Sequence, residues 1–211
     1  MPSFRNITTL IFDFGGVLMD LDKERCIQNF KDLGFPDVER YLGEFLQAGI
    51  FLDMEKGILD APAFRSEIRK KVSCELSDEQ IDEAWNSFLV GMPTEKLDML
   101  LELKKKFKLL LLSNTNPIHM AYSQEIFMQH GGKPMSGYFH KRYLSYEMGL
   151  AKPDAAIFQK MVEDADLIPS ECLFLDDGIK NIEEGSRIGF QTYLVSKNKN
   201  LGFLLEEETW Q

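Results

Sequence analysis

The sequence predicts an α/β protein with a doubly wound, mostly parallel sheet and an inserted α-helical cap. Three observations predict this fold. Near-continuous apolar runs, typical of strands buried on both faces, recur along the chain. Helical patterns alternate with these runs over residues 94–211, as in parallel sheets with crossover connections. Between the first apolar run and residue 94 the patterns are helical only, which indicates a helical unit inserted after the first strand.

The strands are predicted where the apolar runs are shortest and densest. Four runs predict strands at 8–14, 107–115, 172–178 and 191–196, and a weaker one lies within 138–147. Two helices are predicted between them. The first spans 94–106 and starts at a possible cap, Thr94, and the second spans 152–167 with Pro153 in its first turn, where a missing N–H is tolerated.

Four helices are expected in the inserted unit. Asp22 caps the first, Asp60 caps the third, and Ser77 forms a capping box with Gln80 at the start of the fourth. The second is expected over the apolar residues Val38, Leu42, Phe45 and Leu46. We therefore predict a core of residues 1–18 and 94–211 and a cap of residues 19–93. Since ligands of open α/β sheets bind beyond the carboxyl ends of the strands, the cap should overhang the site.

Charge and composition restrict the partners. The chain has 211 residues and a formal net charge of −10, which argues against nucleic acid or an anionic membrane as the main partner. The three cysteines are far apart and form no zinc-like pattern, as expected in a reducing compartment. No apolar run approaches the ~18 residues of a membrane span, and the first ten residues contain no signal segment. We expect a cytoplasmic monomer or homodimer.

Polar side chains follow the predicted strands at the points where they end. Asp13 ends the run at 8–14, Ser113 and Asn114 end the run at 107–115, and Asp176 and Asp177 end the run at 172–178. Each has an ordinary explanation: the serine could start a turn and the aspartates could cap the next helix. Because the carboxyl ends of parallel strands meet at one edge of the sheet, their joint placement favours a site over coincidence.

Lys152, at the start of a predicted helix, adds a positive charge to this edge, although alone it would be taken for a surface lysine. Carboxylates that approach a phosphate dianion need a divalent cation between them, and Mg²⁺ suits one or two carboxylates plus substrate oxygens. Asp13 and Asp176, with Asp177, could hold this ion, while Lys152 and the Ser113 hydroxyl stabilise the transferred phosphoryl group. Asp13 would then be a nucleophile that forms an aspartyl-phosphate.

The strings "FDFGGVL", "LLSNTN", "GLAKPD" and "FLDDGIKNIEEG", in that order, resemble the four motifs of the haloacid dehalogenase-like hydrolase superfamily, and the helical insertion resembles its subclass I. Within it the pattern is similar to bacterial phosphatases that act on α-D-glucose 1-phosphate. The resemblance implies roles for the following residues: Asp13 as nucleophile; Asp13, the Gly15 carbonyl, Asp176 and Asp177 around Mg²⁺; Ser113, Lys152, Asn114 and the Gly16 N–H on phosphate; and Asn181 as an orienting residue.

Gly15 is the departure from the family's pattern. Most phosphatases of the family carry there an aspartate that protonates the leaving group and then activates water, whereas glycine has no proton to give. Asp20 and Asp22 are close in sequence, but closing the turn into the cap and capping its first helix explain them better. Without a proton donor, we expect the best substrates to have good leaving groups, such as a sugar 1-phosphate or an aryl phosphate.

We predict a Mg²⁺-dependent phosphatase acting on a small phosphorylated metabolite, such as a hexose 1-phosphate. In the cap, Glu55 and Lys56 lie in a turn that resembles the family's specificity loop, and Asn116 and His119 could face the cleft; an ordinary solvated turn explains the first two equally well. Three alternatives remain. A metal-independent dehalogenase would lack the aspartate pair, a receiver-type domain would lack the insertion, and a non-catalytic phosphate-binding protein would need no acid.

Overall fold

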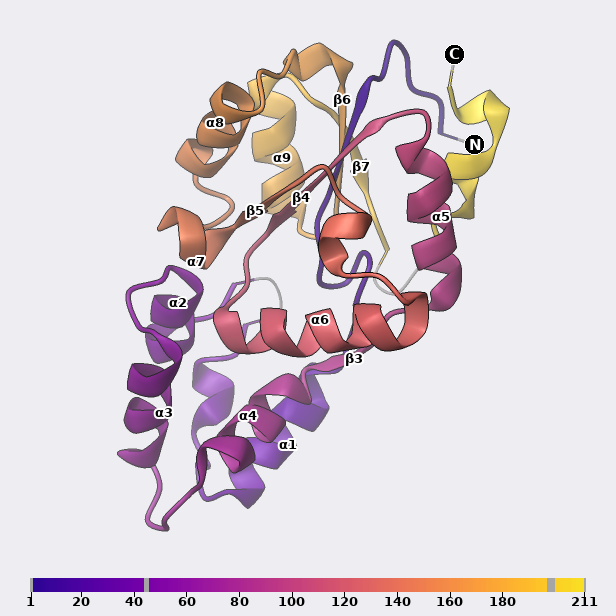
Figure 1. Ribbon diagram of the computed structural model, residues 1–211. Helices are drawn as coiled ribbons and strands as arrows, with labels where there is room; N and C mark the ends of the chain where they lie inside the picture. Colours follow the sequence, from indigo (N-terminus) through magenta and orange to yellow (C-terminus); the bar gives the residue numbers. More distant parts are fainter. Residues whose placement is uncertain (1, 44–45, 197–199, 211) are drawn as a thin grey trace.

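The computed structural model describes residues 2–43, 46–196 and 200–210, and it centres on a five-stranded parallel sheet (Figure 1). The strands lie in the order β5-β4-β1-β6-β7. Their bounds are Thr9–Phe12 (β1), Lys108–Ser113 (β4), Lys141–Leu144 (β5), Cys172–Asp176 (β6) and Gln191–Leu194 (β7). All five predicted strands are therefore confirmed, and so is the predicted fold class.

The register of the sheet places the chemistry-bearing residues together. Phe12 of β1 pairs with Leu111 of β4 and with Leu175 of β6, and all three strands run in the same direction. The residues just beyond them are therefore neighbours at one edge, where the Asp13 N–H donates to the Leu175 carbonyl at 2.9 Å. This edge is a topological switch point, because β4 and β5 lie on one side of β1, and the chain then crosses over to form β6 and β7 on the other side.

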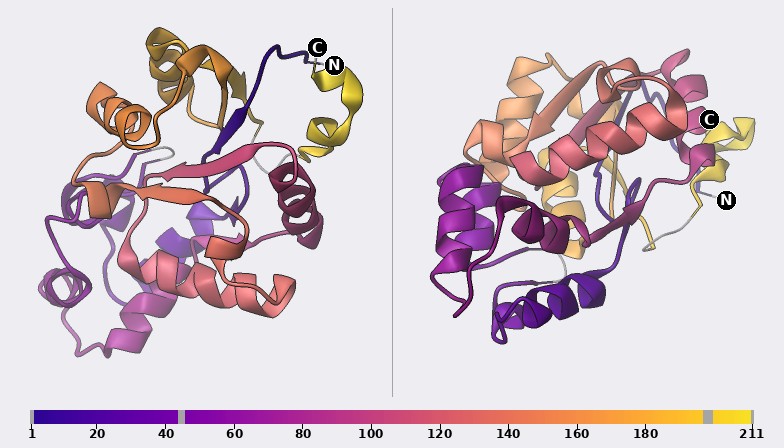
Figure 2. Two further views of the ribbon diagram at one scale, coloured as in Figure 1. Left: turned by 45° about the horizontal axis from the view of Figure 1, so that its top comes forward. Right: turned by 60° about the horizontal axis from the view of Figure 1, so that its bottom comes forward.

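Helices cover both faces of the sheet (Figures 1 and 2). Helices α5 (Thr94–Lys104) and α6 (Pro117–Gly131) pack on the face that carries Leu10 and Phe12. Helices α8 (Ala155–Asp164) and α9 (Ile179–Ile188) pack on the face that carries Ile11, and the short α7 (Ser145–Met148) follows β5. Alternate residues of β1 thus enter different cores, and the three central strands β1, β4 and β6 are buried on both faces, as their continuous apolar runs indicate.

The segment after β1 forms four helices beyond the carboxyl edge of the sheet (Figure 1). They are α1 (Lys23–Asp32), α2 (Gly49–Glu55), α3 (Ala61–Arg69) and α4 (Asp78–Asn86). The strands β2 (Asp20–Leu21) and β3 (Leu89–Gly91) pair antiparallel where the chain enters and leaves this unit. These crossings lie near the predicted boundaries at 18/19 and 93/94; the division into two domains itself stays a prediction.

An aromatic cluster holds the helices of the cap together. The Phe51 ring lies 5.5 Å from that of Phe30, 5.2 Å from that of Phe64 and 4.9 Å from that of Trp85, between centroids. Full burial of each such side chain contributes about 1.5–3 kcal/mol. Trp85 also stacks on His119 of α6 at 4.2 Å, which fixes the cap against the sheet-bearing part of the chain.

The helix starts confirm some predictions and correct others. The Asp22 and Asp60 carboxylates accept from backbone N–H groups, and Ser77 and Gln80 form the capping box. The expected cap residue Thr94 is wrong, because Pro93 occupies the cap position. Pro153 lies before α8, not in its first turn, because the Asp154 carboxylate caps that helix. The aspartate pair does not cap α9; Gly178 does, without a side-chain cap.

The prediction of the second cap helix is also wrong. Val38–Arg40 form a single 3₁₀ turn, and α2 begins only at Gly49. Gly43 falls inside the expected helix, where glycine costs about 1 kcal/mol relative to alanine. The apolar residues Val38 and Leu42, four positions apart, are buried without an α-helix. Phe45 lies outside the described residues. None of the helices in the described part of the chain is long and apolar enough to cross a membrane.

Candidate active site

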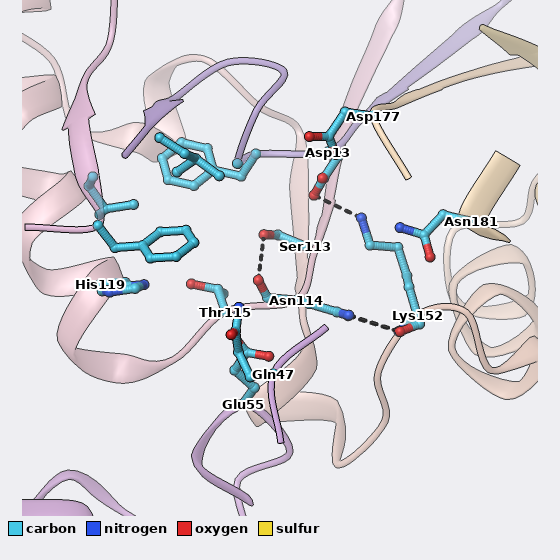
Figure 3. A pocket seen from close by; sticks show the side chains of 15 residues that line it. Asp13, Gln47, Glu55, Ser113, Asn114, Thr115, His119, Lys152, Asp177 and Asn181 are labelled. Atoms are coloured by element: carbon cyan, nitrogen blue, oxygen red, sulfur yellow. Dashed lines mark hydrogen bonds and ion pairs between the residues drawn. The ribbon is translucent and has the colours of Figure 1, made fainter. Parts of the chain in front are cut away.

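Three carboxylates and one ammonium group meet at the carboxyl edge of the sheet. Figure 3 shows three of these side chains, those of Asp13, Asp177 and Lys152. Asp13, Asp176 and Asp177 each offer one oxygen, and these oxygens lie within 4.8 Å of one another. Lys152 Nζ lies 2.8 Å from Asp13 Oδ1 and 2.6 Å from Asp176 Oδ2. Asp13, Asp176 and Lys152 are buried, so these charges are taken out of water and depend on one another.

Asn114 fixes the backbone that carries the lysine. Its Nδ2 donates to the Lys152 carbonyl at 2.9 Å, and its Oδ1 accepts from the Lys152 N–H at 2.8 Å. The segment after α7 is thereby held against the end of β4, and Lys152 is 2% exposed. The surface-lysine explanation of Lys152 is therefore wrong.

Asp176 is held on both of its oxygens. Oδ1 accepts from the Gly178 N–H at 2.7 Å and from Asn181 Nδ2 at 2.8 Å, while Oδ2 accepts from Lys152. The side chain of Asn181, on the first turn of α9, thus orients the carboxylate. Asp176 is acceptor-only in this network, which is the state a metal ligand requires.

The glycines after Asp13 make room for other residues. Gly16 has φ +75°, and a Cβ there would lie 2.0 Å from Asp177 Oδ2, so only glycine allows this carboxylate to rest against the loop. At Gly15 a Cβ would lie 3.1 Å from Leu21 Cδ1. A side chain at Gly15 would therefore begin in tight contact with the end of the Leu21 side chain of β2.

The electrostatics of the cluster favour a bound cation. Burial raises the pKa of Asp13 to about 8; Lys152 lowers it, and Asp176 and Asp177 raise it further. Burial lowers the pKa of Lys152, but its pairing with Asp13 and Asp176 outweighs this, and the net shift is upward. One lysine cannot balance three carboxylates once Asp13 is ionised. Hard carboxylate oxygens in this number and arrangement fit Mg²⁺, which would remove that excess.

A pocket opens beside the cluster and is closed on the far side by the cap (Figure 3). The wall from the sheet side includes Asp13, Gly15, Ser113, Asn114, Thr115, His119, Lys152, Asp177 and Asn181. The cap side supplies the apolar Leu21, Phe88 and Leu89 and the polar Gln47 and Glu55. The cap therefore shields the carboxylates from solvent and adds polar groups of its own.

The structure brings together most, but not all, of the residues predicted for the site. Gly16, Lys56 and Asn116 are outside the pocket wall, as is Asp176, which lies behind Lys152 and Asp13. Asn116 instead caps α6 by accepting from the His119 N–H. Gln47 and Thr115 line the pocket without having been predicted. No local pattern marks Gln47, whereas Thr115 could have been found because it directly follows Ser113 and Asn114.

Two oxygens of residues that line the pocket from the cap are buried and have no hydrogen-bond partner in the described chain. Gln47 Oε1 and Glu55 Oε2 have no hydrogen-bond partner among the described residues, and Glu55 is only 4% exposed. Burial raises the pKa of Glu55 to about 8, with a further increase from Asp13 and a decrease from Lys152. An unpaired buried polar group costs about 1–3 kcal/mol, which a ligand that pairs with it would recover.

Replacing Glu55 with glutamine is therefore expected to stabilise the metal-free protein in a pH-dependent way. Below about pH 4 the carboxyl group is protonated in both states, and the substitution changes little. As pH rises toward about 8, the unfolded carboxyl ionises while the folded one keeps its proton, so the wild type loses stability. Near pH 7 we expect a gain of about 1–3 kcal/mol in the free energy of unfolding, measured by denaturant titration.

The control is Glu163→Gln, which removes an exposed carboxylate on α8 and should leave the free energy of unfolding unchanged at both pH values. If Glu55→Gln changed the free energy of unfolding by the same amount at about pH 4 and about pH 7, Glu55 would not be buried and protonated in the folded protein.

Comparisons with known proteins agree with this geometry. Residues 7–189 match the family described as haloacid dehalogenase-like hydrolase. The chain is 41% identical over 187 residues to the D-ribitol-5-phosphate phosphatase of Bacteroides thetaiotaomicron, covering 89% of this chain and 91% of the relative.

Solved structures similar to this chain belong to the same family. A haloacid dehalogenase family enzyme from Bacteroides thetaiotaomicron, in complex with magnesium and inorganic phosphate, has a TM-score of 0.89 and 43% identity, covering 95% of this chain and all of that one. A haloacid dehalogenase-like hydrolase from Porphyromonas gingivalis has a TM-score of 0.88 and 36% identity, covering 95% of this chain and 98% of its own.

Proposed function

The chain belongs to the haloacid dehalogenase-like hydrolase family and is a Mg²⁺-using phosphatase of that family, and from this premise we propose that it hydrolyses sugar or polyol phosphates through a phosphorylated Asp13. The observation that carries the mechanism is the meeting of Asp13, Asp176 and Asp177 with Lys152 at one edge of the sheet. A magnesium and phosphate complex of a similar enzyme supports this use of the edge.

Asp13, Asp176, Asp177 and the Gly15 carbonyl would hold the metal. Bound Mg²⁺ supplies positive charge that lets a carboxylate approach a phosphate dianion. The Asp13 carboxylate attacks phosphorus in line with the leaving oxygen, and Lys152 and the Ser113 hydroxyl donate hydrogen bonds to the phosphoryl oxygens. The two hydrogen bonds between Asn114 and the Lys152 backbone hold the lysine in place. The Gly16 N–H, predicted to bind phosphate, instead donates to the Met19 carbonyl at 2.8 Å.

The cap side of the pocket favours a hydroxylated leaving group. Gln47 Oε1 is a buried acceptor that a substrate hydroxyl can satisfy. His119 Nε2 lies 3.1 Å from the Trp85 carbonyl, so Nε2 carries the proton, and burial lowers the pKa of His119 to about 4. The neutral ring therefore offers Nδ1 as a second acceptor. A polyol chain suits these acceptors, and the similar D-ribitol-5-phosphate phosphatase makes D-ribitol 5-phosphate the first substrate to test.

A phosphate-release assay with Mg²⁺ tests the proposal. The panel contains D-ribitol 5-phosphate, D-ribose 5-phosphate, glycerol 3-phosphate, α-D-glucose 1-phosphate and p-nitrophenyl phosphate. We expect kcat/KM for the five-carbon phosphates to exceed that for glycerol 3-phosphate by about 10-fold or more, since each satisfied buried acceptor contributes ~1 kcal/mol. Gln47→Leu should narrow this gap. Release no greater than that of Asp13→Asn protein on every substrate would refute the proposed function.

A further inference from the structure

The departing oxygen of an alkyl phosphate needs a proton, and four of the described residues around the nucleophile are unsuited to give it. Gly15 has no side chain, and Leu21 occupies the adjoining space. Asp176 accepts hydrogen bonds on both oxygens, and Asp13 is the nucleophile. Lys152 bridges two carboxylates, and its raised pKa makes it a poor acid. The proton therefore has to come from another part of the wall.

Glu55 lies on the cap side of the pocket, opposite the sheet edge that carries Asp13. It is the last residue of α2, its side chain lines the pocket from the cap, and Figure 3 shows it well separated from Asp177. Its Oε2 is buried and has no hydrogen-bond partner in the described chain, so this oxygen is left for a molecule bound in the pocket to satisfy. Of the described wall residues contributed by 19–93, Glu55 alone has a titratable side chain.

We propose that Glu55, projecting from the cap, is the general acid and general base of the reaction, in place of a residue beside the nucleophile. The inference rests on the proposed phosphatase function. Its geometric basis is the in-line character of phosphoryl transfer: with Asp13 attacking from the sheet edge, the leaving oxygen points away from Asp13 toward the cap. Glu55 is the acidic group that the cap presents there.

The reaction takes two steps, in which Glu55 first gives a proton and then takes one back. In the first, an Asp13 oxygen bonds to phosphorus, the bond from phosphorus to the leaving oxygen breaks, and the Glu55 proton moves to that oxygen. In the second, a water oxygen bonds to phosphorus, its proton moves to the Glu55 carboxylate, and the bond from phosphorus to Asp13 breaks. Inorganic phosphate leaves, and both carboxyl groups return to their starting states.

The charged and titratable groups around the pocket support a protonated Glu55. Burial raises its pKa to about 8, close to the value that suits an acid at neutral pH. Asp13, at the end of β1, raises it further, and Lys152 lowers it. His119 of α6 is neutral, because burial lowers its pKa to about 4, and Asp177 adds a carboxylate on the sheet side.

The test compares leaving groups in Glu55→Gln protein. For D-ribitol 5-phosphate, whose leaving alkoxide needs a proton, kcat/KM should fall ~10²–10⁴-fold. For p-nitrophenyl phosphate, whose leaving group needs none, kcat/KM should stay within about 10-fold of wild type. Because the variant also lacks the base, turnover of p-nitrophenyl phosphate should show a burst of nitrophenol followed by a slow steady state. A preference for good leaving groups, which the glycine at position 15 predicts, should therefore appear in Glu55→Gln protein.

Three further measurements separate proton transfer from a structural role. The kcat/KM for D-ribitol 5-phosphate should decline on the alkaline side in wild type, and Glu55→Gln should lose that limb. Glu55→Asp should recover part of the rate. Gln47→Asn, which changes a neighbouring buried polar group without removing a proton, should keep the alkaline limb and give no burst. Thermal unfolding shows that each variant is folded.

Equal losses on both substrates, an unchanged rate on D-ribitol 5-phosphate, or a persistent alkaline limb in Glu55→Gln would each overturn this inference and leave the phosphatase function standing. Wild-type protein that cleaves neither phosphate would overturn the proposed function as well.

Discussion

Asp13→Asn protein is expected to release phosphate at least roughly 10⁴-fold more slowly than wild type at saturating substrate. The amide keeps the size of the side chain but removes the charged oxygen that would attack phosphorus. It also removes one of the three carboxylates that converge at the sheet edge, so the affinity for Mg²⁺ should fall as well. The measurement is kcat for D-ribitol 5-phosphate at saturating Mg²⁺.

The fold of Asp13→Asn protein should survive, which makes the loss interpretable. Lys152 still has Asp176 at 2.6 Å, and a neutral amide in a buried position avoids the desolvation that raises the pKa of Asp13. Circular dichroism and the melting temperature should therefore match or exceed those of wild type. A folded variant that keeps more than a tenth of the wild-type rate would rule out Asp13 as the nucleophile.

Lys152→Met is expected to lower both activity and stability. The substitution leaves Asp13 and Asp176 buried without their shared cation, and breaking a buried ion pair in this way costs about 3–5 kcal/mol. It also removes a donor to the transferred phosphoryl group, so kcat should fall by roughly 10²–10³-fold. Denaturant unfolding without Mg²⁺ and steady-state kinetics with Mg²⁺ measure the two effects separately.

Mg²⁺ provides the internal check on the lysine prediction. Because the ion would neutralise the carboxylates that the variant leaves unpaired, Mg²⁺ should stabilise Lys152→Met more than it stabilises wild type. Lys160→Met, which changes an exposed lysine on α8, should alter neither quantity. Equal stabilisation of the wild type and Lys152→Met by Mg²⁺ would mean that the lysine and the metal do not share the same carboxylates.

The strand pattern predicted which polar residues lie at the carboxyl edge of the sheet. Asp13, Ser113 and Asp176 each end a buried apolar run, and parallel strands bring such ends to one edge whatever the loops do. Capping signals were equally local, and Asp22, Asp60 and Ser77 act as expected. The errors fell where local preference competes with packing, as at Gly43, where a 3₁₀ turn and a later helix replace one continuous helix.

By itself, the sequence determined the fold class, the family motifs and the set of residues at the carboxyl ends of the strands, because all of these depend on local periodicity and on the fixed direction of parallel strands. The tertiary structure alone decided which cap residues enter the pocket. Glu55 faces Asp13 across 42 positions of sequence only because α2 and the aromatic cluster around Phe51 pack as they do. Such packing depends on the fit of many side chains at once, and no short sequence pattern records it.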